Sequence, residues 1–199
     1  MIRNKVALAC AATLMLGASV SIAQHHGGDM QKVRPVKSTQ EPTGADKEFM
    51  NKAAMANNAE IEWGKLATQK ASSMAVKRYG HLMVKDHSEA NFKLKEIAVG
   101  KKVFLPEDVP AAERNAMNRI GGLSGAAFDK AFMAHMVKAH EAAVALFSRQ
   151  AKNGKDPDLK NYAVQTLPHL RMHLKSAKAG GLPEKKAGKR SSGKKRRGG

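Results

Sequence analysis

Apolar residues recur at three- and four-residue steps through four long stretches of this chain, and this periodicity constrains its fold more than any other feature. The spacing is that of one face of an α-helix. The four stretches cover about residues 46–72, 73–100, 124–152 and 157–179. Aromatic residues make up only 5% of the chain, whereas strands favour aromatic and β-branched side chains. The pattern therefore predicts an all-α fold and argues against a β-sandwich.

Helix-breaking residues separate these stretches. Pro106 and Pro110 lie in a long break between the second and third stretches, and a short helix over about residues 111–120 is expected inside it. Asp156-Pro157 is typical of a helix N-terminus, and Pro168 is expected to kink the last helix. Two long helices, a long crossover and two more long helices predict a four-helix bundle of the ferritin-like type.

The charge of the chain is concentrated at its C-terminus. The formal net charge is +18, from 35 Lys and Arg against 17 Asp and Glu. Residues 183–199 hold eight basic side chains and one acidic side chain, without apolar periodicity, so they are predicted to form a disordered polybasic tail. Such a tail can bind anionic lipid headgroups or lipopolysaccharide phosphates. Without aromatic residues to stack on bases, sequence-specific nucleic-acid recognition is not expected. The alternative is a tail that only promotes solubility.

The N-terminus has the pattern of a secretory signal peptide over residues 1–23. Arg3 and Lys5 precede an uncharged apolar run, and small residues lead to a cleavage site expected after Ala23. The alternative is an uncleaved membrane anchor, but polar and small residues interrupt the run, and a spanning helix needs about 20 apolar residues. No later segment is apolar for long enough to span a bilayer. The pattern predicts a periplasmic or outer-envelope protein.

The predicted organisation follows from these segments. Residues 24–45 are rich in Gly, Pro, Gln, Ser and Thr and lack periodicity, so they are predicted to be a flexible linker. The bundle then covers residues 46–182, between this linker and the basic tail. The one cysteine, Cys10, lies in the signal segment, so the mature chain is expected to have neither a disulfide nor a thiolate metal ligand.

The apolar face of each of the four predicted long helices, here called its apolar seam, contains one ionisable residue where a core residue is expected. The four residues are Glu60, His87, His140 and His173. Three imidazoles and one carboxylate could ligate a single zinc, iron, copper or manganese ion, and bundles build metal sites from side chains on facing helices. The alternative is a buried network of hydrogen-bonded polar groups without metal. The depth of each residue along the bundle distinguishes the two.

Other ionisable residues are weaker candidates for ligands. His135 lies about 140° around its helix from His140, so both cannot easily point to one centre. His169 precedes His173 by four residues, a spacing at which one helix can chelate one ion. His81 is predicted to lie at the surface. Asp86 and Glu89 flank His87 and are predicted to be surface charges; the alternative is that they are hydrogen-bond partners that orient the histidines. The abundant methionines are predicted to fill the core.

Five runs of this sequence are similar to those of a known family. The runs are AEIEWGKLA (59–67), MVKDHSEAN (83–91), SGAAFDKAFMAHMVKAHEAAVALF (124–147), KDPDLKNYA (155–163) and TLPHLRMHL (166–174). In this order they resemble the bacterial "domain of unknown function 4142", over about residues 46–179. The resemblance implies a secreted, ferritin-like helical domain of the envelope, and the four seam residues lie in the matching runs. It implies no known activity.

Three functional hypotheses are consistent with this sequence. The first is a non-enzymatic, metal-binding or stress-related envelope protein that uses the four seam residues as ligands. The second is a structural or adaptor protein with a buried polar network, tethered to anionic surfaces by its tail. The third is a metal-dependent enzyme, but no nucleophile–base pair supports it. Val84 and Leu170 also stand three residues before His87 and His173, where ferritin-like di-iron proteins carry glutamate.

Overall fold

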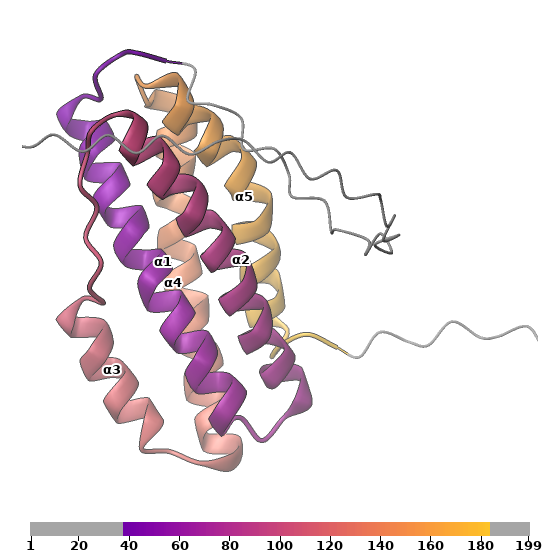
Figure 1. Ribbon diagram of the computed structural model, residues 1–199. Coiled ribbons are helices and arrows are strands. Elements are labelled where there is room, and N and C mark those ends of the chain that lie inside the picture. The colour runs from indigo at the N-terminus through magenta and orange to yellow at the C-terminus, as the bar shows by residue number, and fades with distance from the viewer. Residues whose placement is uncertain (1–37, 184–199) are drawn as a thin grey trace, which may run out of the picture. The chain divides into compact units, whose positions relative to one another are not determined.

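The computed structural model describes residues 38–183, which form five α-helices and no strand (Figure 1). The helices are α1 (Gly44–Lys70), α2 (Met74–Gly100), α3 (Ala111–Gly121), α4 (Gly125–Asn153) and α5 (Pro157–Lys178). The all-α prediction is therefore confirmed, and the predicted helices coincide with the observed ones to within a few residues. The expected signal peptide (1–23), residues 24–37 of the expected linker and all of the tail after Pro183 lie outside the described residues.

Four of these helices form a bundle of two antiparallel hairpins. Residues 71–73 join α1 to α2, and residues 154–156 join α4 to α5. The hairpins pack with α1 against α4 and α2 against α5. The crossover, which includes α3, runs beside α1 from one end of the bundle to the other (Figure 1). The predicted four-helix bundle with a short helix in its crossover is thus observed, and α2 and α4 point in the same direction.

Side-chain caps explain where the helices begin. Thr43 and Asp46 form a reciprocal capping box at the start of α1, so the last two residues of the predicted linker are helical. Ser73 accepts a hydrogen bond from the backbone of Ala75 at the start of α2. Asp156 caps α5, with Pro157 at the first helical position, as the sequence predicts. The helix α5 continues through its internal proline, Pro168.

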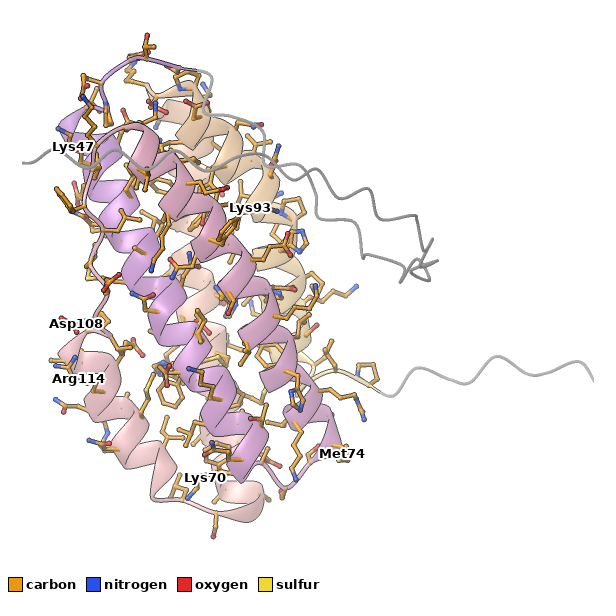
Figure 2. The ribbon with its side chains drawn as sticks, viewed as in Figure 1. Lys47, Lys70, Met74, Lys93, Asp108 and Arg114 are labelled. Atoms are coloured by element: carbon orange, nitrogen blue, oxygen red, sulfur yellow. The ribbon has the colours of Figure 1, made fainter. Side chains whose placement is uncertain are left out.

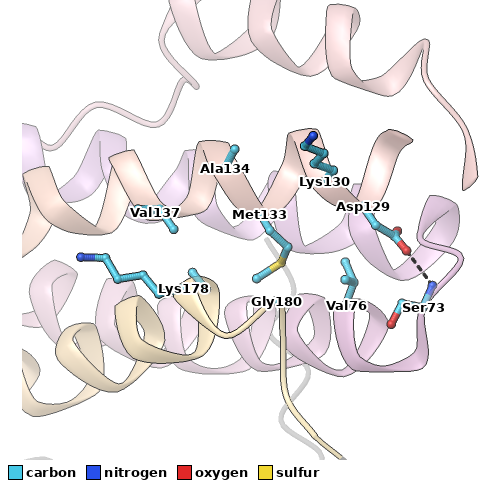
Figure 3. Close-up of a pocket in the computed structure, with 10 residues that line it drawn as sticks. Ser73, Val76, Asp129, Lys130, Met133, Ala134, Val137, Lys178 and Gly180 are labelled. Atoms are coloured by element: carbon cyan, nitrogen blue, oxygen red, sulfur yellow. Dashed lines mark hydrogen bonds between the residues drawn. The ribbon is translucent and has the colours of Figure 1, made fainter. Parts of the chain in front are cut away.

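The first hairpin packs closely and is attached to α4 at its turn. A Cβ atom on Gly80 would lie 2.8 Å from the carbonyl oxygen of Gly64, so glycine at these positions lets the two helices approach closely. The Asp129 carboxylate of α4 accepts hydrogen bonds from the backbone amides of Ser72 and Ser73, at 3.0 and 2.8 Å; the bond to Ser73 is drawn in Figure 3. These bonds fix the turn between α1 and α2 against α4.

A buried ion pair closes the opposite end of the bundle. The ammonium group of Lys101, just after α2, lies 2.6 Å from a carboxylate oxygen of Asp156 and 3.1 Å from one of Asp158. It also donates to the carbonyl oxygens of Ser38 and Gln40. The Lys101 side chain is 1% exposed. The ammonium group therefore joins the end of α2, the start of α5 and the segment before α1. Lys101 lies in the break predicted between the second and third helical stretches, where nothing in the sequence indicates a buried charge.

The core consists of two apolar clusters that follow one another along the bundle. One cluster includes Trp63, Tyr79, Met83, Phe128, Phe132 and Met136. The other includes Phe49, Met50, Leu94, Phe147, Leu159 and Leu170. Charged side chains such as Lys47, Lys93 and Arg114 project from the outside (Figure 2). Within residues 38–183, no helix has the length and apolar character needed to cross a bilayer.

Candidate metal centre

A layer of buried polar side chains separates the two apolar clusters. Three of its members are His87 on α2, His140 on α4 and His173 on α5, and their exposed fractions are 4%, 0% and 1%. On each of α1, α2, α4 and α5, the buried apolar residues on one side of this polar layer belong to the first cluster, and those on the other side belong to the second. The three histidines therefore lie at the same depth, which their seam positions alone did not establish.

The three imidazole rings surround a common centre. The ring centroids are 5.7 Å apart for His87 and His140, 5.4 Å for His87 and His173, and 5.3 Å for His140 and His173. One nitrogen from each ring can be chosen so that all three lie within 4.8 Å of one another. We call these three residues the histidine triad.

Each ring of the triad is oriented by a hydrogen bond on one side. The bonds are His87 Nδ1 to Asn57 Oδ1 (3.0 Å), His140 Nδ1 to the Met136 carbonyl oxygen (3.0 Å) and His173 Nε2 to Asp86 Oδ2 (2.9 Å). Amide, carbonyl and carboxylate oxygens can only accept, so these ring nitrogens carry the hydrogen. The opposite nitrogen of each neutral ring therefore holds a lone pair.

These opposite nitrogens are buried and have no hydrogen-bond partner among the described residues. They are Nε2 of His87, Nε2 of His140 and Nδ1 of His173. Metal-binding histidines typically donate their other N–H to an oxygen acceptor, which fixes the ring and its tautomer. A zinc ion 2.0–2.1 Å from three nitrogens needs them roughly 3.3–3.6 Å apart, so small movements of the rings would complete the site.

Burial keeps two rings of the triad, His87 and His140, uncharged. Burial and the neighbouring His140 and His173 lower the pKa of His87 well below its ordinary value. Burial and His173 likewise lower the pKa of His140 to about 3. Both rings are therefore neutral at pH 7, so protons do not occupy the nitrogens that would face an ion.

Glu60, the fourth predicted ligand, is not part of this group. It is buried on α1, with one carboxyl oxygen 3.8 Å from Nδ1 of His140, the nitrogen that already donates to Met136. Burial and repulsion from Glu113 raise the pKa of Glu60 to about 8. At the level of the triad, α1 instead contributes the Asn57 amide, one helical turn before Glu60. Sequence reasoning missed Asn57, although it lies on the same face of α1.

Asp86 is not the surface charge that the sequence favoured but takes the alternative role, that of a hydrogen-bond partner of a histidine. Its side chain is only 9% exposed, since α5 packs over this part of α2. Burial would raise the pKa of Asp86, but the hydrogen bond and charge of His173 and the ion pair with Lys85 lower it to about 2. Asp86 therefore supplies a carboxylate that orients a triad ring.

The other three histidines within residues 38–183 lie outside the triad. His81 is exposed, and the side chain of His169 is 62% exposed. His135 packs against Trp63 with ring centroids 4.3 Å apart and its ring tilted by 36°, and it pairs with Glu113 at 3.0 Å. Glu89 is exposed and pairs with Lys93, as expected for a surface residue. The groove in Figure 3, lined by residues including Val76 and Met133, contains no residue of the triad.

Comparison with known proteins identifies one family. A family model described as "Domain of unknown function (DUF4142)" matches residues 31–179, a span that includes all five helices and the whole triad. No curated protein and no solved structure matches the chain.

Proposed function

Because this chain belongs to the DUF4142 family of unknown function, we propose a function from the site itself: the protein holds one transition-metal ion on His87, His140 and His173. One observation carries this proposal. One nitrogen from each of three buried rings can be chosen so that all three lie within 4.8 Å of one another, and each ring has one nitrogen without a hydrogen-bond partner among the described residues while its other nitrogen donates to an oxygen acceptor. This is the arrangement expected of metal-binding imidazoles and their supporting groups.

The donor set favours zinc or copper over manganese. Imidazole suits zinc, copper and iron, whereas manganese prefers carboxylate and water oxygens. The triad offers three imidazoles. The nearby Glu60 is set back from the triad, and its raised pKa keeps it protonated at pH 7.

The alternative, a structural polar network without metal, accounts less well for the same atoms. A network would satisfy both nitrogens of each ring, because a buried polar group without a partner costs about 1–3 kcal/mol. Here three nitrogens in one layer lack a partner among the described residues. A bound ion would supply all three with a partner at once.

The metal content of the purified full-length protein tests this proposal. We expect about one zinc or copper ion per chain by elemental analysis, as in a three-histidine site with one open position. The ion should be lost in His140→Ala and retained in His81→Ala, whose exposed histidine is the matched control. Circular dichroism should show that both variants fold. Equal metal content in the wild type and His140→Ala would overturn the proposal.

We also propose that the protein works in the cell envelope and that its tail attaches it to anionic surfaces. The signal-peptide pattern of residues 1–23 and the eight basic side chains of residues 183–199 support this. N-terminal sequencing of exported protein should begin at Gln24. Deletion of residues 183–199 should weaken co-sedimentation with anionic phospholipid vesicles at low salt. Undiminished co-sedimentation would contradict the role of the tail.

A further inference from the structure

The histidine triad is closed to solvent, so an ion needs a route to it. None of its rings is more than 4% exposed. Among the described contacts, one short chain of metal-binding groups leads outward from the triad. It begins at His173, passes through Asp86 and ends at His169, whose side chain is 62% exposed.

A single carboxylate oxygen connects the exposed histidine to the buried one. Oδ2 of Asp86 lies 2.9 Å from Nε2 of His173 and 3.8 Å from Nδ1 of His169. The two histidines are four residues apart on α5, so they share one face of that helix. The other oxygen of Asp86 pairs with the exposed Lys85 at 3.2 Å, which leaves Oδ2 to the histidines.

His173 is the triad member that also contacts the outer pair, Asp86 and His169. Its Nε2 faces Asp86, and its Nδ1 is one of the three unpartnered nitrogens. One imidazole ring therefore separates the exposed His169 and the Asp86 carboxylate beneath it from the proposed metal position. Both donor types bind borderline divalent cations such as zinc and cobalt.

We propose that His169 and Asp86 form a capture site through which a divalent transition-metal ion enters and leaves the histidine triad. This inference rests on the proposed function. The ion first binds to Nδ1 of His169 and Oδ2 of Asp86. Movement of the His173 ring away from Asp86 then admits the ion to the triad. His169 acts on the path and is not a ligand of the final site.

Rates of metal transfer test the path separately from the site. Metal-free full-length protein would be mixed with cobalt(II) chloride in a stopped-flow spectrometer, and release would be followed after addition of EDTA. We expect His169→Ala to slow uptake and release by the same factor, roughly tenfold, because the ion loses one of the two donors that hold it at the capture site. The dissociation constant should then stay unchanged. His81→Ala, which removes another exposed histidine, should match the wild type.

The possible outcomes distinguish this inference from the proposed function. Wild-type rates in His169→Ala would overturn the capture site while leaving metal binding intact. Loss of cobalt at equilibrium in His169→Ala would make His169 a ligand and would also overturn the path. If the wild type binds no cobalt, both proposals fail. His140→Ala, which lacks a triad ligand but retains Asp86 and His169, should show no stable cobalt absorption band.

Discussion

Replacing Lys101 with methionine is expected to destabilise the bundle more than any surface charge change. The substitution keeps a long apolar side chain but removes the ammonium group that joins α2, α5 and the segment before α1. Asp156, whose side chain is 0% exposed, then loses its cation. Asp158 loses a partner as well, but its side chain is 15% exposed and remains closer to water.

The distances give the size of the effect. Two unit charges 2.6 Å apart attract by about 6 kcal/mol at an effective dielectric constant of 20. Removing one partner of a buried pair costs about 3–5 kcal/mol in practice. Asp156 still accepts hydrogen bonds from the backbone amides of Asp158 and Leu159, so we expect a loss of about 3–4 kcal/mol. In a domain of this size that loss lowers the melting temperature by roughly 10 °C.

Urea unfolding followed by circular dichroism measures this loss. Lys95→Met is the matched control, because Lys95 is 51% exposed and its pair with Glu107 is 3.5 Å long. The control should change the free energy of unfolding by less than about 1 kcal/mol. Adding Asp156→Asn to Lys101→Met should restore part of the stability, since asparagine also caps helices. A loss below about 1 kcal/mol in Lys101→Met would refute the reasoning about the buried charge.

Three further predictions concern packing, pH and metal. Gly80→Ala should lower the free energy of unfolding by about 1–3 kcal/mol, because its Cβ would lie 2.8 Å from the Gly64 carbonyl oxygen; Gly44→Ala, which faces open space, is the control in the same urea titration. Burial raises the pKa of Asp46, but hydrogen bonds from Gln150, Thr43 and Lys155 outweigh it and lower the pKa below 3.8. The stability that this carboxylate contributes is therefore present above pH 3.8 and is lost as the pH falls further. Urea titrations between about pH 2 and 7 should show that the free energy of unfolding falls less with acid in Asp46→Asn than in the wild type. Zinc at 100 times its dissociation constant should stabilise the wild type by about 2.7 kcal/mol in thermal denaturation. A similar gain in His140→Ala would contradict the proposal that the histidine triad binds the ion.

Much of the fold follows from local patterns. Apolar periodicity predicts all four long helices, and Asp156-Pro157 marks the start of the last one. The same periodicity places His87, His140 and His173 on buried faces, because a residue in an apolar seam turns inward wherever the helix packs. Those predictions depend only on the rotation of about 100° per residue within one helix.

The groups that support the triad could not be predicted in the same way. Asp86 precedes His87 by one residue and so faces a different direction around α2, and it is buried only because α5 covers that direction. Lys101 follows the end of α2, where a lysine is ordinarily exposed to solvent. Its partners come from residues far along the chain, at the start of α5. Neither the Asp86–His173 contact nor the ion pairs of Lys101 can be predicted from the residues next to Asp86 or Lys101 in the sequence.

The sequence by itself determined which helices form, which faces they bury and which ionisable residues those faces contain. Only the tertiary structure decided that three of the four seam residues meet while Glu60 does not. Periodicity reports direction around a helix axis, but depth along the bundle depends on how the helices are offset against one another. Asn57 and Glu60 share a face of α1, yet they differ in depth by about 4.5 Å, more than twice a metal–nitrogen distance of about 2 Å. The contacts that set this offset, such as the Gly64–Gly80 approach, join separate helices.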